Sequence, residues 1–213
     1  MRLHAPLFIS LFLAIHCFAE NSILQKPIEI SVYNLTSGPS LQLTSITGDS
    51  TILPTYSGAL TKWQKVVAPI KIGKEEDSSA SATWTPAEGA DAGKWILIYY
   101  MDQSSKEAKV RAFPAKTLMR DKSTLFLINL TALNLKGKSG DGELGLGPNS
   151  HTYLEISRPN LSIQLKSSAT PHYAQVSLIE LDSGQSYLLL FAEPYIKGSA
   201  MLNHQLVTFP NIN

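Results

Sequence analysis

The stretch from Ser123 to Ser157, STLFLINLTALNLKGKSGDGELGLGPNSHTYLEIS, has a less regular counterpart earlier in the chain, from Ile30 to Gly58, ISVYNLTSGPSLQLTSITGDSTILPTYSG. In both stretches an apolar run ends in Asn-Leu-Thr, and a Gly-Asp turn and a proline follow. Asn129 follows Asn34 by 95 residues, and apolar runs further downstream keep about the same offset. A likeness at a fixed offset indicates an internal duplication, here of a β module.

Short apolar or alternating runs, separated by turn residues, fill both copies. Ile28–Tyr33 and Leu41–Ile46 alternate with a period of two, which predicts two strands of a hairpin or meander. The polar residues Lys74–Ser81 predict a loop, and no window shows the helical period. About six or seven strands per copy are typical of an immunoglobulin-like sandwich. We therefore expect an all-β fold, with tandem immunoglobulin-like β-sandwich modules over residues 20–115 and 116–213.

The first nineteen residues have the pattern of a signal peptide. Arg2 provides a positive charge, Leu7–Ile15 is apolar, and Cys17 and Ala19 are small residues before the expected cleavage site. The apolar run is much shorter than the roughly 20 residues that a membrane-spanning helix needs. We therefore expect residues 1–19 to be removed and the exported protein to be periplasmic or secreted, without a membrane span.

Composition excludes several classes of protein. Cys17 is the single cysteine and lies in the expected signal peptide, so the mature chain should have no disulfide, thiolate metal site or cysteine nucleophile. Eighteen basic and seventeen acidic residues nearly cancel, and the sequence shows no basic stripe. Nucleic acid is therefore not an expected partner. We interpret the acidic run Glu75–Asp77 as a solvated loop rather than a cation site, because it lacks the spacing of a calcium loop.

The motifs do not assemble into a catalytic or cofactor site. Gly48-Asp49-Ser50 is similar to the nucleophile block of SGNH ester hydrolases, but the Asp-x-x-His that supplies the base is absent. An esterase that uses Ser50 is therefore a minor alternative, and we expect a protein that is not an enzyme. His151, His172 and His204 lie in separate segments without the short spacing of metal ligands, so neither a metal nor another cofactor is expected.

Two features are candidates for contact with a partner. The loop Gly147–Tyr153 concentrates polar side chains and an aromatic ring, and loops on rigid sandwiches often carry recognition. The alternative is that Pro148 and its neighbours only make a turn. Trp63 lies among polar neighbours, where an aromatic side chain is less expected to belong to the core. The candidate partner-binding residues are Asn149, Ser150, His151, Tyr153 and Trp63. For Asn34 and Asn129, which begin glycosylation sequons directly after apolar runs, we expect a structural role in the turn.

Two resemblances suggest a function. At Asn129–Thr131, Gly140–Gly142, Gly147–His151 and Glu155-Ile156, the second copy resembles the second half of the alginate O-acetylation accessory protein F family. This resemblance implies a periplasmic adaptor without enzymatic activity, accessory to exopolysaccharide modification, whose partner is an envelope protein or a polysaccharide-modifying complex.

The segment Asp121–Leu133 also resembles the Asp-Arg-Glu-Ser-x-Phe segment of periplasmic pilus chaperones. That resemblance implies the alternative of a chaperone-like protein, which binds its partner by adding a strand to a sheet edge.

Overall fold

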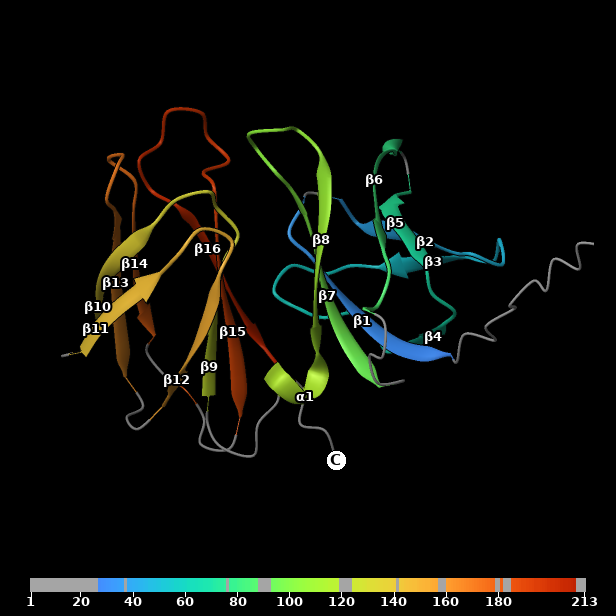
Figure 1. Cartoon of the computed structure of the whole chain (residues 1–213), viewed down its shortest axis with the longest axis horizontal. Coiled ribbons are helices and arrows are strands. Elements are labelled where there is room, and N and C mark those ends of the chain that lie inside the picture. Colours follow the sequence, from blue (N-terminus) through green and yellow to red (C-terminus); the bar gives the residue numbers. More distant parts are fainter. Residues whose placement is uncertain are drawn as a thin grey trace, which may run out of the picture.

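The computed structural model describes residues 27–36, 38–75, 77–87, 93–118, 124–140, 142–156, 160–178, 181 and 185–209. The expected signal peptide lies outside these residues. The described chain is nearly all β and forms four-stranded sheets in two pairs, which confirms the expected fold class of two β-sandwich modules (Figure 1). None of the described helices has the length and apolar character needed to cross a membrane.

Module 1 consists of an inner sheet in the order β4-β1-β7-β8 and an outer sheet in the order β3-β2-β5-β6. Its strands are β1 (Ile28–Asn34), β2 (Ser40–Ser45), β3 (Ser50–Pro54), β4 (Gln64–Val66), β5 (Ile70–Lys74), β6 (Asp77–Trp84), β7 (Lys94–Met101) and β8 (Ala108–Pro114). A four-residue helix, α1 (Ala115–Leu118), follows β8 and leads toward the second module.

Module 2 repeats this arrangement. Its strands are β9 (Thr124–Asn129), β10 (Leu135–Ser139), β11 (Gly142–Leu146), β12 (His151–Glu155), β13 (Leu161–Ser167), β14 (Tyr173–Leu178), β15 (Ser186–Ala192) and β16 (Asn203–Thr208). The inner sheet has the order β12-β9-β15-β16 and the outer sheet the order β11-β10-β13-β14. Adding eight to each strand number of module 1 gives the order in module 2, so the duplication read from the sequence extends to the topology.

Each inner sheet has a parallel pair at its centre. Ile30 of β1 lies opposite Trp95 of β7, and Phe126 of β9 lies opposite Leu188 of β15. The sheets of immunoglobulin domains are antiparallel, and each module has eight described strands rather than six or seven. The sandwich class is thus as expected, while the parallel pair at the centre of each inner sheet differs from the pairing of immunoglobulin domains.

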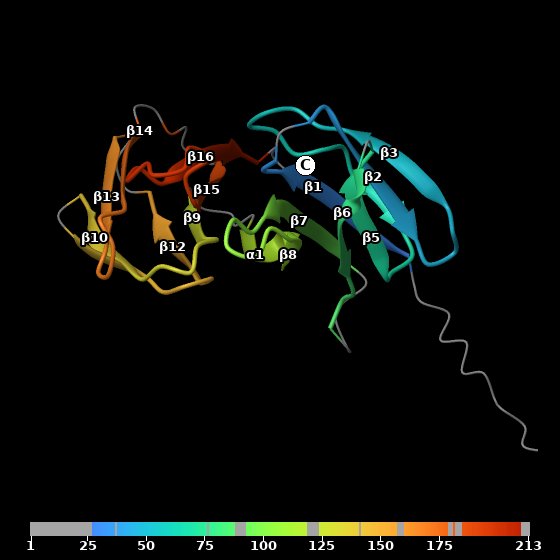
Figure 2. The ribbon, with the colours of Figure 1, turned by 90° about the horizontal axis from the view of Figure 1, so that it is seen from above.

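The two inner sheets pack against each other, which makes the molecule four layers thick (Figure 2). Tyr33, Ile98 and Phe113 of module 1 share one apolar core with Phe126, Leu188 and other residues of module 2. A second core lies between the inner and the outer sheet of module 1, and a third lies between those of module 2. Because both faces of the inner sheets are covered, all of β9 and β15 except Ala192 is buried. The modules therefore form one body with three cores.

Two local expectations from the sequence are wrong. The runs that form β1 and β2 lie in different sheets rather than in one hairpin, because β1 pairs with β4 and β7 while β2 pairs with β3 and β5. The polar residues expected to form a loop enter β6 from Asp77 onward, where they pair with β5 around a β-bulge. Strand propensity is weak, and pairing with a neighbouring strand overrides it.

Candidate binding site between the modules

The edge strand β8 of module 1 lies beside the edge strand β12 of module 2, and aromatic rings join them. The rings of Phe113 and Phe126 meet edge to face, with their centroids 5.6 Å apart. The imidazole of His151 stacks on the ring of Phe126 at 5.2 Å and meets the ring of Phe113 at 5.3 Å. We call this region, where β8 and β12 meet, the β8–β12 edge.

His151 and Tyr153 project from the same face of β12. His151 lies opposite Ile128 and Tyr153 opposite Phe126 on β9, and directly opposed residues of antiparallel strands project to one face. Ile128 and Phe126 belong to the core between the modules, so His151 and Tyr153 face module 1 as well. Both stay exposed, Tyr153 at 46% of its surface, because β12 is the last strand of its sheet. The structure thus brings together two of the candidates proposed from the sequence.

Arg111 of β8 completes this edge. Its Nη1 donates to the carbonyl oxygen of Asn129 at 3.4 Å, its Nη2 lies 3.5 Å from Nδ1 of His151, and its guanidinium lies over the Phe113 ring at 5.4 Å. Partial burial lowers the pKa of Arg111, but a guanidinium remains charged in proteins. Among the described residues, no carboxylate lies within ion-pair distance of Arg111. The ion pairs described join Lys94 to Glu29 and Lys109 to Asp102.

The protonation of His151 follows from its neighbour. A guanidinium can only donate hydrogen bonds, so Nδ1 of His151 accepts and the ring proton lies on Nε2. Burial, followed by the positive charge of Arg111, lowers the pKa of the His151 imidazole. The ring is therefore neutral at pH 7, and Arg111 carries the charge of the pair.

Sequence reasoning missed Arg111, because its place between the modules depends on strand register rather than on a local motif. In the strand register, Arg111 lies opposite Ile98 of β7, as Gln205 lies opposite Leu190 of β15. Arg111 then corresponds to Gln205, which is partly buried. The second copy therefore has an uncharged polar residue where module 1 has a charge.

The loop before β12 is held from within by Asn129. Nδ2 of Asn129 donates to the carbonyl oxygens of Leu133 and Gly147, at 2.8 and 2.7 Å. Its Oδ1 accepts from the amide and the hydroxyl of Thr131, at 3.0 and 2.7 Å. Asn34 makes the same pair of contacts with Thr36 in module 1. The structural role expected for both amides is confirmed.

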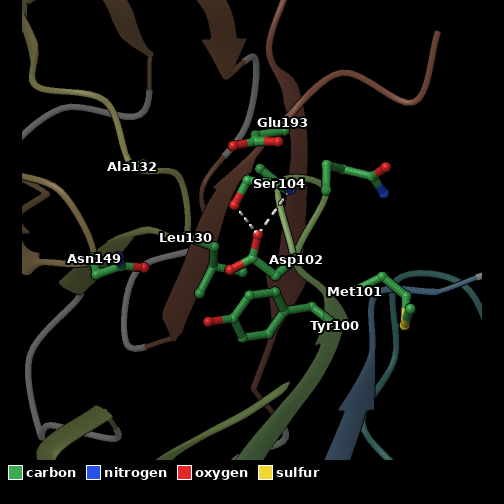
Figure 3. A pocket seen from close by; sticks show the side chains of 10 residues that line it. Tyr100, Met101, Asp102, Ser104, Leu130, Ala132, Asn149 and Glu193 are labelled. Atoms are coloured by element: carbon green, nitrogen blue, oxygen red, sulfur yellow. Dashed lines mark hydrogen bonds between the residues drawn. The ribbon is translucent and has the colours of Figure 1, made fainter. Parts of the chain in front are cut away.

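Asn149 and Ser150 extend this loop. The amide of Asn149, which has a φ of 49°, donates to the carbonyl of Thr131, and the hydroxyl of Ser150 donates to that of Gly147. Asn149 also lines a small cavity between the modules, together with Tyr100, Asp102, Ser104 and Glu193 among others (Figure 3). The cavity volume of about 30 Å³ has room for water but not for an organic ligand.

Trp63, the remaining candidate, lies elsewhere. It directly precedes β4, the edge of the inner sheet opposite to β8, so the structure does not bring it to the loop. Its ring is partly buried against the core between the modules, and Nζ of Lys94 lies 5.2 Å from the ring centroid.

The residues considered for catalysis and metal binding lie apart from one another in the described fold. The hydroxyl of Ser50 contacts the side chains of Gln42 and Thr44 and the carbonyl of Leu43. His172 Nδ1 contacts the hydroxyl of Thr170 at 2.7 Å, whereas His151 and His204 lie on β12 and β16. Across the described ranges, no three potential metal ligands cluster.

The outer sheet of module 2 carries a group of lysines that the sequence did not reveal. Lys136 of β10 lies opposite Lys166 of β13, and Lys138 projects from the same face two residues along β10. All three are exposed, with Glu143 opposite Lys138. The sequence separates Lys136 from Lys166 by 30 residues, so only the strand register brings them together.

Fold and site together define a tandem β-sandwich protein that carries a polar site where its two modules meet. Comparison with known proteins finds no family model that matches the chain and no curated protein that matches it.

Proposed function

We propose that this protein is an exported, non-enzymatic binding protein of the cell envelope, periplasmic or secreted, which holds a partner at the β8–β12 edge. The observation that carries the proposal is the loop before β12. Asn129 fixes the loop from a completely buried position, while His151 and Tyr153 remain exposed. A site that is ordered before binding loses little conformational entropy when a partner arrives.

The resemblance to the alginate O-acetylation accessory protein F family supports an adaptor role in exopolysaccharide modification. The partner would then be an envelope protein or a polysaccharide-modifying complex. The thickness of the scaffold also suits an adaptor, because four packed layers with three cores keep the binding edge in one position.

A photo-crosslinking experiment in the native envelope tests the proposal. A crosslinking residue replaces Tyr153, and a matched variant carries it at Gln164, which is exposed on the outer sheet of module 2. We expect one discrete adduct from position 153 and none of that size from position 164. The pair His151→Ala and Tyr153→Ala should also reduce capture of the same partner while the fold is retained. Unchanged capture would mean that these two side chains of β12 do not contact the partner and that the loop before them is only a turn.

Binding by strand addition is a second candidate, and an exposed edge favours it. β3 is the edge of the outer sheet of module 1, and Ile52 on it is 52% exposed. The amide of Ser45 donates to Asp49, and ladder bonds alternate, so the amide of Ile52 points away from β2. Ile52→Pro therefore removes a donor for an added strand without breaking the β2–β3 ladder, and Ile52→Ala is its control. Partner capture lost only with proline would support this candidate over the β8–β12 edge.

The Ser50 esterase is tested directly on the pure protein. We expect no hydrolysis of activated esters. Hydrolysis that disappears in Ser50→Ala would overturn the non-enzymatic proposal, whereas hydrolysis that persists in this variant indicates a contaminant.

A further inference from the structure

We infer that Arg111, with His151 beside it, forms a binding site for a carboxylate group at the β8–β12 edge. The inference rests on the proposed binding role of this edge and names the chemistry that the edge recognises. It begins from the placement of a charge, because Arg111 lies opposite Ile98 of β7, a residue of the apolar core between the modules.

The guanidinium of Arg111 is poorly satisfied by the protein. It has five N–H donors, and its described contacts are the carbonyl of Asn129 at 3.4 Å and the imidazole of His151 at 3.5 Å. Both acceptors are neutral, and both distances exceed the roughly 2.7–2.9 Å of charge-assisted hydrogen bonds. A partly buried charge is costly unless it is paired, and no described carboxylate pairs with this one.

The local charges select a monoanion. Lys109, two residues before Arg111 on the same face of β8, is neutralised by Asp102. His151 is neutral, so the edge has one positive charge without a described counterion. A carboxylate has one negative charge and matches the planar fork of a guanidinium with two parallel hydrogen bonds. A phosphate dianion would leave one negative charge uncompensated.

The neighbouring groups suit the rest of a carboxylate ligand. Because Nδ1 of His151 faces Arg111, Nε2–H is the remaining donor of an exposed ring. Tyr153 stands two residues along the same face of β12 and offers an amphipathic side chain against which the body of a ligand can pack.

NMR titration of the full mature chain tests the site. The signals followed are the Hε1 proton of His151 and the Nε–Hε pair of Arg111, at pH 7 and constant ionic strength, with sodium chloride as the reference salt. The probes are sodium acetate, sodium glucuronate, N-acetylglutamate amide and sodium phosphate. We expect saturable shifts with the three carboxylates, at millimolar dissociation constants, and a rise in the pKa of His151 as the bound anion stabilises the imidazolium.

Two variants give the test its specificity. Arg111→Gln keeps hydrogen-bond donors but removes the charge, so carboxylate affinity should fall at least tenfold. Lys94→Gln removes an exposed cation that pairs with Glu29 at the start of β7, four residues before Ile98, the residue opposite Arg111, and should leave affinity unchanged. Circular dichroism of both variants verifies the fold.

The outcomes separate this inference from the proposed function. Shifts no larger than those with chloride, equal affinity in Arg111→Gln, or saturable binding of phosphate alone would overturn the carboxylate site. If crosslinking at Tyr153 succeeds while no carboxylate binds, only this inference fails. If carboxylates bind while crosslinking fails, only the adaptor proposal fails. Tighter binding of glucuronate than of N-acetylglutamate amide would assign the carboxylate to a sugar acid, and the reverse order would assign it to an acidic side chain.

Discussion

Asn129→Ala should destabilise the protein by about 4 kcal/mol, which is the loss of four hydrogen bonds at roughly 1 kcal/mol each. Asn129 has no exposed surface, and its partner Thr131 is also completely buried. Water therefore cannot replace the lost contacts of the Thr131 hydroxyl without local unfolding. A buried polar group without a partner costs more than the average hydrogen bond contributes.

The duplicated copy supplies the control. Asn34 makes three corresponding hydrogen bonds, two to Thr36 and one to the hydroxyl of Thr55. Thr36 and Thr55 are both partly exposed, so water can satisfy them after substitution. Asn34→Ala should then cost only about 2 kcal/mol. Because both variants change the same motif, the difference between their losses in free energy of unfolding measures the effect of burying the hydrogen-bond network.

Urea unfolding followed by two probes is the assay. All three tryptophans, Trp63, Trp84 and Trp95, belong to module 1, whereas far-ultraviolet circular dichroism reports on both modules. Because the inner sheets share a core, Asn129→Ala in module 2 should shift the tryptophan transition of module 1 by the same amount as the dichroism transition.

Two results would refute this reasoning. An unshifted tryptophan transition in Asn129→Ala would mean that the modules unfold independently despite their shared core. A cost for Asn34→Ala that equals or exceeds that for Asn129→Ala would mean that burial of the network does not set its energy.

Three further predictions concern stability. A Cβ atom at Gly137 would lie 1.8 Å from the backbone oxygen of Gln164 on β13, so Gly137→Ala should destabilise the protein by several kcal/mol or prevent folding. Gly145 has open space around it, so Gly145→Ala should change the urea midpoint little. Burial raises the pKa of Tyr33 to about 12, above the value of about 10 of an unperturbed tyrosine. The stability that depends on neutral Tyr33 is therefore complete below about pH 10 and should fall as the pH rises further. Thermal unfolding of Tyr33→Phe should show a smaller decline over this pH range. The hydrogen bond from Lys109, followed by that from Ser104, holds the pKa of the Asp102 carboxyl well below its usual range. The contribution of Asp102 to the free energy of unfolding is therefore present above about pH 4 and should be lost as the pH falls. Asp102→Asn should make the free energy of unfolding depend less on pH below about pH 4.

The sequence alone determines the features of this protein that depend on neighbouring residues. The repeated Asn-Leu-Thr motif predicts a duplication, and the structure places the motif at the ends of β1 and β9 with the same contacts to the following threonine. Gly48, with a φ of 88°, lies in the turn between β2 and β3, where the Gly-Asp pattern predicts it. These features are predictable because an Asx turn or a positive φ is satisfied within a few residues.

Only the tertiary structure decides how the sheets are assembled. The continuous apolar run of β7 is compatible with burial on both faces, but neither its parallel partner β1 nor the second covering sheet can be read from spacing. The same holds for the site. The sequence makes His151 a candidate through its neighbours in Gly147–Tyr153, whereas the contact of His151 with Arg111 joins residues 40 positions apart. Such contacts depend on which apolar faces pack together, and packing is decided by shape and burial over the whole chain rather than by any local pattern.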